Sequence, residues 1–161
     1  MANWCDIELE IEAAADKDFK RIQDGLEFER KLSCSRMHMM FIGSHRRYLD
    51  YIDTDYVNNW ITVYGSVRWG IENAEMADIV RWLQHLGDIK YLKCHIEEGE
   101  CKIYGDYEYR YEFPPKLTYT YLPCEHYPDY ADEDTEDPDH LVTKLEYAFN
   151  KFKVIDEITD W

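Results

Sequence analysis

Cysteine and histidine side chains stand close together at two places in this chain of 161 residues. Cys124 and His126 form a Cys-x-His pair, and Cys94-His95 is followed by Cys101 on what we expect to be the next strand. Thiolate and imidazole groups bind zinc, but structural zinc sites usually combine two pairs of ligands at short loop spacing. The second pair is missing here, so we expect ordinary thiols and no metal or other cofactor.

Motifs for catalysis are missing as well. A nucleophilic cysteine needs a depressed pKa and an oriented base, and no cysteine of this sequence stands in a recognisable electropositive turn. Asp53-Thr54-Asp55 followed by Asn58 resembles part of a calcium loop, yet the glycine and the terminal glutamate of such a loop are absent. We find no glycine-rich phosphate loop and no nucleophile elbow. The sequence therefore favours a protein without catalytic residues.

One basic segment, residues 30–49, contains no Asp or Glu in an otherwise acidic chain. Within it, Arg36, His38, Arg46 and Arg47 could bind an anion such as a phosphorylated metabolite or a nucleotide. The alternative is that these cations neutralise neighbouring carboxylates of the folded chain. Both interpretations stay open from the sequence.

Acids and tyrosines are densest toward the C-terminal end. Eight of the 14 tyrosines stand between residues 104 and 130, and residues 125–139 carry eight acids and no Lys or Arg. Carboxylates can replace phosphates and tyrosine rings can replace stacked bases, so such a surface could occupy a basic groove made for nucleic acid. The alternative is a solvated acidic face with tyrosines in the core. The candidate partner-binding residues are Tyr119, Tyr121, Tyr127, Asp129, Tyr130, Asp132, Glu133, Asp134, Glu136 and Asp137.

The charge of the whole chain favours a basic partner. Acidic residues number 34 and basic residues 18, which gives a formal net charge of −16. Such a field repels phosphate backbones and anionic membranes and attracts basic surfaces, so we expect no direct nucleic acid or membrane binding. The longest apolar run, residues 39–42, is too short to span a bilayer, and no signal peptide is recognisable. With five irregularly spaced cysteines, we expect a soluble cytoplasmic protein with reduced thiols.

Hydrophobic periodicity predicts the elements that must position these residues. Alternation of apolar and polar residues predicts strands at residues 6–12, 32–42, 60–71, 89–97 and 100–113. Apolar stripes of helical period predict helices at residues 16–29 and 73–86. Residues 43–59 show neither period, and we expect an irregular excursion there. The order of these elements predicts a ferredoxin-like split βαβ arrangement of the α+β class, with two helices on one face of an antiparallel sheet.

The C-terminal residues are expected to extend this core. We predict a short strand, an acidic loop, a helix and a last strand, at residues 118–122, 125–139, 141–151 and 154–155. Residues 1–116 would form the core domain, and residues 117–161 an extension packed on the same domain.

Two short stretches carry a resemblance to a known family. The chain begins Met1-Ala2-Asn3-Trp4-Cys5 and then enters a strand, and Gly105-Asp106-Tyr107-Glu108-Tyr109 follows the acidic turn Glu97-Glu98-Gly99. Over about residues 1–113 the chain thus resembles the YubB ferredoxin-like family of phage and plasmid proteins. The resemblance implies a mobile-element origin and a structural, buried role for Trp4 and Cys5. The chain departs from the family's pattern at Asp6-Ile7, and the family supplies no catalytic residues to carry over.

Together these observations predict a non-enzymatic accessory protein of a phage or plasmid. We expect it to inhibit a host defence complex, of the CRISPR or restriction type, by binding a nucleic-acid-handling protein through an acidic, tyrosine-rich surface. The alternative is a small-ligand-binding or nucleotide-binding protein, or an enzyme, that uses the basic segment 30–49. A third interpretation is a homodimer that pairs through exposed sheet edges.

Overall fold

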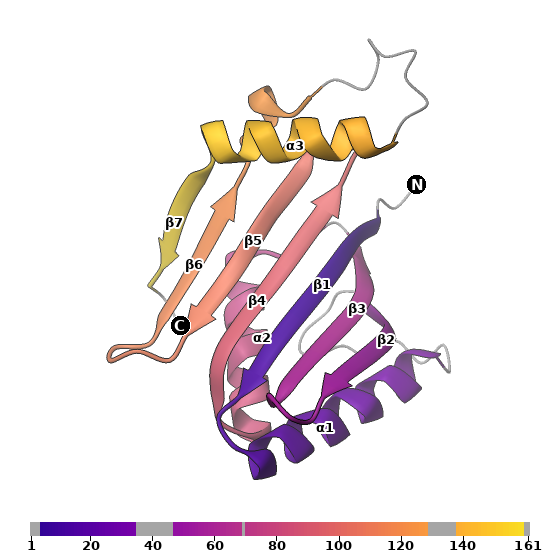
Figure 1. The fold of residues 1–161 in the computed structure, drawn as a ribbon, viewed down its shortest axis with the longest axis vertical. Coiled ribbons are helices and arrows are strands. Elements are labelled where there is room, and N and C mark those ends of the chain that lie inside the picture. Colours follow the sequence, from indigo (N-terminus) through magenta and orange to yellow (C-terminus); the bar gives the residue numbers. More distant parts are fainter. Residues whose placement is uncertain (1–3, 35–46, 69, 129–137, 160–161) are drawn as a thin grey trace.

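The computed structural model describes residues 4–34, 47–68, 70–128 and 138–159, which form an α+β fold (Figure 1). The described strands belong to one seven-stranded antiparallel sheet in the order β2-β3-β1-β4-β5-β6-β7. The α+β class predicted from the sequence is therefore confirmed. In chain order the elements are β1 (Trp4–Ala13), α1 (Asp16–Cys34), β2 (Arg47–Asp55), β3 (Trp60–Arg68), α2 (Asn73–Leu86), β4 (Ile89–Glu98), β5 (Ile103–Arg110), β6 (Lys116–Tyr121), the 3-10 turn η1 (Cys124–His126), α3 (Pro138–Phe152) and β7 (Val154–Ile158).

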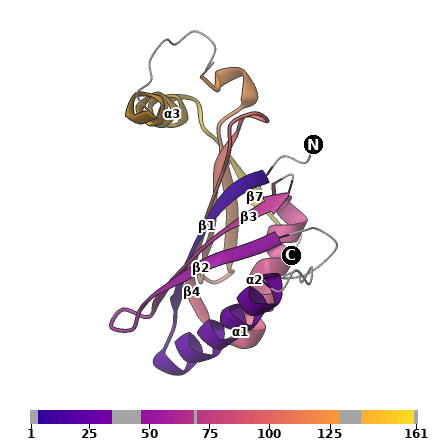
Figure 2. The same ribbon diagram turned by 90° about the vertical axis from the view of Figure 1, so that its right-hand side faces the viewer.

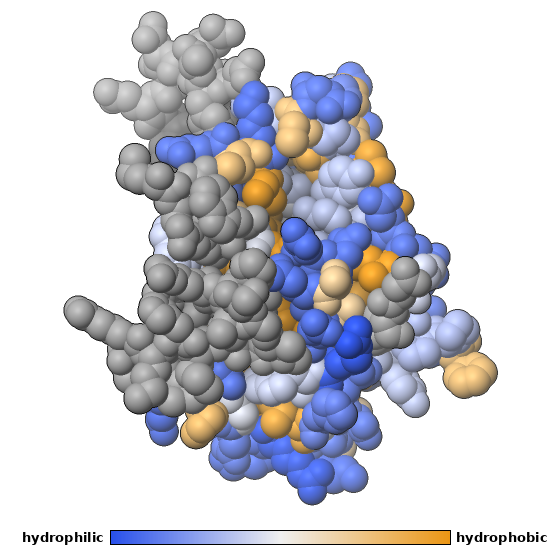
Figure 3. Space-filling model, turned by 180° about the vertical axis from the view of Figure 1, so that it is seen from behind, coloured by the Kyte–Doolittle hydropathy of each residue, from blue (hydrophilic) through white to orange (hydrophobic). Residues whose placement is uncertain are grey.

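The helices lie on both sides of the sheet. α1 and α2 cover one face, which we call the helix face, and α3 crosses one end of the strands on the other side (Figure 2). We call that other side the open face, since α3 covers only its end. Seen from the helix side, the described residues present mainly hydrophilic side chains with scattered apolar ones (Figure 3).

β1 lies near the middle of the sheet because its alternation suits a strand with one buried and one polar face. Cys5, Ile7, Leu9 and Ile11 are buried on the helix face, and the acids between them point to the open face. Leu9 lies opposite Val63 of β3 on one side and opposite Cys94 of β4 on the other. A slip by one residue would move the apolar set into solvent, so the alternation determines the register.

Apolar stripes on α1 and α2 complete the main core. Glu72 and Glu75 form a capping box that starts α2. Asp18 near the start of α1 is buried, and its Oδ1 accepts a hydrogen bond from the backbone N–H of Asp88 at 3.1 Å. This bond ties the beginning of α1 to the turn between α2 and β4. The buried stripe residues are Phe19, Ile22, Leu26, Met76, Ala77, Ile79, Val80 and Leu83.

The expected second strand is wrong where the structure tests it. α1 continues to Cys34, so residues 32–34 are helical, and the rest of the predicted strand over 32–42 lies outside the described residues. The second strand of the sheet is instead β2, within the segment expected to be an excursion. A bulge between Leu49 and Tyr51 interrupts the period of two, which hides this edge strand from pattern analysis.

The C-terminal elements extend the same sheet. The layout therefore differs from the predicted ferredoxin-like arrangement. A ferredoxin-like unit has four strands and two helices, whereas here β5, β6 and β7 continue the sheet and α3 lies on the opposite side from α1 and α2 (Figures 1 and 2). α3 packs through Leu145 and Ala148 in a second, small core that also contains Leu122 and Tyr127. None of the described helices is long and apolar enough to cross a membrane.

Candidate functional site

Strand register arranges the outward side chains of the open face in rows across β2, β3, β1, β4 and β5. One row consists of Tyr51, Tyr64, Glu8, His95 and Asp106. The next row consists of Asp53, Thr62, Glu10, Lys93 and Glu108. The third row consists of Asp55, Trp60, Glu12, Tyr91 and Arg110.

On β4 and β5 the charges of these rows neutralise one another. His95 Nδ1 lies 2.7 Å from Asp106 Oδ1, and Lys93 Nζ lies 3.9 Å from the other oxygen of the same carboxylate. Hydrogen bonds to Asp106 and Glu97 raise the pKa of His95 to about 9, so its imidazole is a cation at neutral pH. Arg110 pairs with Glu108 of its own strand. This half of the open face is a network of ion pairs.

On β1, β2 and β3 the balance is different. Within the described part of the chain, Glu8, Glu10 and Asp53 form no ion pair with a Lys, Arg or His side chain. The charge of Glu8, with burial and the charges of Asp53 and Glu10, raises the pKa of the Tyr64 phenol. The local potential is therefore negative. We call this region the acidic half and define it by its open-face residues Asp6, Glu8, Glu10, Tyr51, Asp53, Trp60 and Tyr64.

Aromatic rings alternate with the carboxylates of the acidic half. Tyr51 and Tyr64 stack with ring centroids 6.1 Å apart, and their side chains remain 59% and 39% exposed. Trp60 contacts Tyr91 across β1 with ring centroids 5.9 Å apart. Exposed rings beside carboxylates attract cationic side chains through the negative ring face and through charge-assisted hydrogen bonds. The acidic half is therefore chemically suited to a basic partner.

A small hollow of about 120 Å³ lies between the two halves of the open face, lined by Glu8, Glu10, Lys93 and His95. Its walls carry opposite charges, because the two carboxylates come from β1 and the two cations from β4. Such walls favour neither an anion nor a metal ion. Among the described residues, no group of three or more His, Cys, Asp or Glu side chains could hold a metal ion.

The described tyrosines of the predicted partner-binding set do not belong to the exposed rows of the open face. Tyr119 is half-buried on the helix-face side of β6 and stacks between Tyr107 and Tyr121, with centroid distances of 4.2 Å and 5.1 Å. Burial raises the pKa of Tyr119 to about 12. Tyr127 is buried in the small core beside Leu145, so its side chain packs within the folded chain. The other members, Asp129, Tyr130, Asp132, Glu133, Asp134, Glu136 and Asp137, lie outside the described residues.

The basic segment falls largely outside the described residues, which exclude Arg36, His38 and Arg46. Arg47 is the first residue of β2. Arg30, at the beginning of the segment, pairs with Glu27 one helical turn earlier at 3.0 Å. The anion-site interpretation therefore stays a prediction.

The two cysteine and histidine pairs of the sequence differ in how they are arranged. In one pair the side chains point to opposite faces of a strand, and in the other the histidine ring packs on another residue. Cys94 is buried on the helix face, whereas His95 points to the open face. The ring of His126 stacks on Phe152 at a centroid distance of 3.9 Å. Burial raises the pKa of Cys5 to about 11, which makes this thiol a poor nucleophile.

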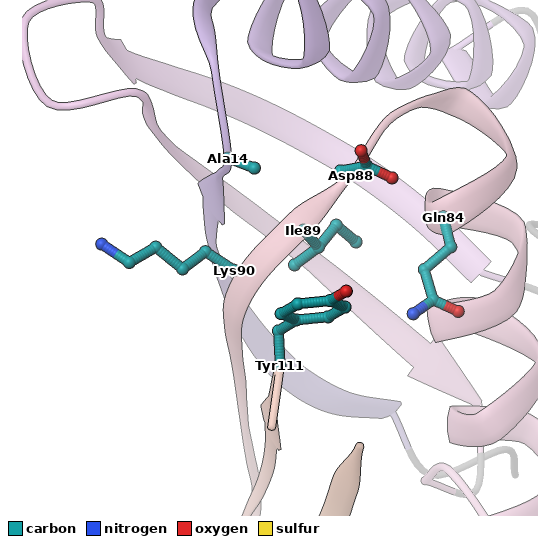
Figure 4. Close-up of a pocket in the computed structure, with 6 residues that line it drawn as sticks. All are labelled: Ala14, Gln84, Asp88, Ile89, Lys90 and Tyr111. Atoms are coloured by element: carbon teal, nitrogen blue, oxygen red, sulfur yellow. The ribbon is translucent and has the colours of Figure 1, made fainter. Parts of the chain in front are cut away.

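A pocket of about 300 Å³ lies beside the end of α2 (Figure 4). Gln84 Nε2 already donates to the Tyr109 hydroxyl at 2.8 Å, and Lys90 extends away from the pocket and pairs with Glu12. Gln84 and Lys90 are thus engaged within the fold. The lining residues are Ala14, Gln84, Asp88, Ile89, Lys90 and Tyr111.

Sequence reasoning missed the acidic half as a surface. The alternation of apolar residues with glutamates at residues 6–12 predicts a strand with one polar side, and that is the one signal the sequence carries. Tyr51 and Asp53 fall in the segment that the sequence predicts to be irregular, and only the pairing of β2 with β3 places them beside Tyr64.

Comparisons of this chain with protein-family models, with curated protein sequences and with solved structures give no match. Its function must be inferred from the geometry of the chain itself.

Proposed function

We propose that this chain is a non-enzymatic protein-binding factor, and that its acidic half docks in the basic groove of a nucleic-acid-handling protein. The observation that carries the proposal is the set of carboxylates on β1 and β2 that form no ion pair with a described cation. Alternate residues of a strand lie about 7 Å apart and neighbouring strands about 4.8 Å apart, so these charges form a regular array. A partner would meet a rigid, pre-organised anionic surface.

Charge and aromatic contact have separate roles in this binding. The net charge of −16 accelerates association with a basic surface, and salt weakens that attraction. The rings of Tyr51, Trp60 and Tyr64 supply the apolar contact that resists dissociation. In RNA-recognition modules an open sheet presents aromatic rings to bases. Carboxylates around the rings repel the phosphates of nucleic acid. The surface therefore favours a protein that itself binds nucleic acid.

The proposal extends to fold and context. We propose that β1-α1-β2-β3-α2-β4 is a ferredoxin-like unit related to the YubB family, which β5, β6 and β7 extend. The order β2-β3-β1-β4, with antiparallel neighbours throughout, supports this. In that context the partner is a host CRISPR or restriction complex in the bacterial cytoplasm, and binding inhibits it. The acidic run 129–137 adds to the net negative charge that steers association with a basic partner.

The test is a pull-down of partners from bacterial lysate with a matched pair of charge variants. Glu8→Gln/Glu10→Gln/Asp53→Asn removes three charges from the acidic half. Glu100→Gln/Glu125→Gln/Glu146→Gln removes three exposed charges elsewhere. We expect the wild type and the second variant to capture a nucleic-acid-handling protein that survives nuclease and is released by high salt. The first variant should lose it.

Equal capture of the partner by both charge variants would refute docking through the acidic half. Loss of the partner on nuclease treatment would show that nucleic acid bridges the two proteins. A further variant neutralises Asp129, Asp132, Glu133, Asp134, Glu136 and Asp137. If that variant alone loses the partner, the binding surface is the acidic run and not the acidic half.

A further inference from the structure

Arg110 shows how this sheet holds a guanidinium group on its open face. Its guanidinium carbon lies 5.4 Å from the ring centroid of Tyr91, and its nitrogens pair with the carboxylate of Glu108. The ring belongs to β4 and the carboxylate to β5, so neighbouring strands supply the two halves of the site. An aromatic face beside a carboxylate is therefore an arginine site that the chain already fills from within.

The same combination recurs in the acidic half without a cation from the described part of the chain. Tyr51 and Tyr64 stack at 6.1 Å with an interplanar angle of 25°. Glu8 lies opposite Tyr64 on β1, and Asp53 follows Tyr51 by two residues on the same face of β2. Among the described residues, no Lys or Arg side chain lies over either ring or pairs with either carboxylate.

We infer that Tyr51, Tyr64, Glu8 and Asp53 form a docking site for an arginine side chain of the basic partner. The inference rests on the proposed function and names the chemistry that this surface recognises. A guanidinium is planar, stacks on aromatic rings and offers five N–H donors, which can serve carboxylates on both sides of the tyrosine pair. A lysine ammonium is a strongly hydrated point charge, so it gains less from the ring faces than a guanidinium does.

The position of the site makes it accessible to a partner. β2 is an edge strand of the sheet, and the β2–β3 hairpin projects from the body of the molecule (Figure 2). Tyr51 and Tyr64 are both exposed, the former at 59% and the latter at 39%. An arginine on the wall of a groove can therefore reach the ring pair from the edge of the sheet.

The test uses two synthetic peptides, four Arg-Gly repeats and four Lys-Gly repeats, titrated into the full chain by calorimetry at low salt. We expect the wild type to bind the arginine peptide about tenfold more tightly than the lysine peptide. Tyr51→Leu/Tyr64→Leu should lose this preference and keep the lysine-peptide affinity within about twofold, because it removes rings and no charge. Tyr51→Phe/Tyr64→Phe keeps the ring faces and should retain the preference.

A matched control is Tyr111→Leu/Tyr147→Leu, which removes two exposed tyrosines elsewhere and should behave as the wild type. The arginine site would be wrong if the wild type bound both peptides equally, or if Tyr51→Leu/Tyr64→Leu still preferred arginine. If Glu8→Gln/Glu10→Gln/Asp53→Asn then lost binding to both peptides, this would still support docking of a basic partner on the acidic half. If that variant bound both peptides as tightly as the wild type, the proposed function would fail as well.

Discussion

At the scale of single residues, strand alternation decides which side chains can meet a partner. Adjacent residues such as Cys94 and His95 point to opposite faces of β4, so their proximity in the sequence carries no joint chemistry. His95 instead forms its contacts across the sheet, with Asp106 on β5 and with Glu97 two residues along β4. It is the cation around which the ion-paired half of the open face is organised.

His95 makes the stability of the fold depend on pH in a defined direction. Hydrogen bonds to Asp106 and Glu97 raise its pKa from 6.5 to about 9 in the folded chain. Folding thus favours the protonated imidazole, and this stabilisation is fully present below pH 6.5 and is lost as the pH rises through about 9. We expect His95→Gln to cost on the order of 2 kcal/mol at about pH 6, allowing for solvent screening, and much less at about pH 10.

Urea unfolding of the wild type and of His95→Gln at the two pH values measures this difference, in which the other titrating groups cancel. A cost that is the same at both pH values would show that His95 contributes packing and not charge.

At the scale of elements, the join between β5 and β6 depends on a residue without a side chain. Gly105 of β5 lies beneath the ring of Tyr119, and a Cβ there would stand 2.8 Å from Tyr119 Cε2 and 2.9 Å from the backbone oxygen of Thr120. Because Gly105 has no side chain, the ring of Tyr119 can pass close to it while it stacks on Tyr107. Close packing of the two strands therefore requires glycine.

We expect Gly105→Ala to destabilise the fold by about 2 kcal/mol, because the backbone of Thr120 cannot rotate away from the added methyl group. Gly25→Ala is the comparison. Its Cβ would meet only the movable end of the Leu86 side chain, and alanine has a higher helix propensity than glycine. Urea unfolding should show the larger loss for Gly105→Ala. A larger loss for Gly25→Ala would mean that the contact of α1 with α2 is tighter than that of β5 with β6.

At the scale of the whole molecule, the charge that suits a basic partner opposes folding. The carboxylates that give the chain its net charge of −16 repel one another in the compact state, and the acidic half places Glu8 and Glu10 on β1 and Asp53 on β2, two strands away. Glu8 and Glu10 follow one another at about 7 Å on the same face of β1, so their like charges repel. A surface retained for binding should therefore be one whose neutralisation stabilises the free protein.

We expect Glu8→Gln/Glu10→Gln/Asp53→Asn to stabilise the chain by about 1 kcal/mol in about 20 mM NaCl and by much less in about 500 mM NaCl, because salt screens the repulsion. Urea unfolding of the variant and the wild type at both salt concentrations measures this. If the variant were less stable than the wild type at low salt, the three carboxylates would be holding the sheet together, and a binding role would not be needed to explain them.

The sequence by itself determined the α+β class, β1, α2 and β4, because each is set by a local period that the burial of one face enforces. It also determined the negative charge and hence the sign of the expected partner. Only the tertiary structure decided that Tyr51, Asp53, Tyr64 and Glu8 share one surface. Their strands meet through pairings between residues far apart in the chain, and a bulge in β2 erased the local signal.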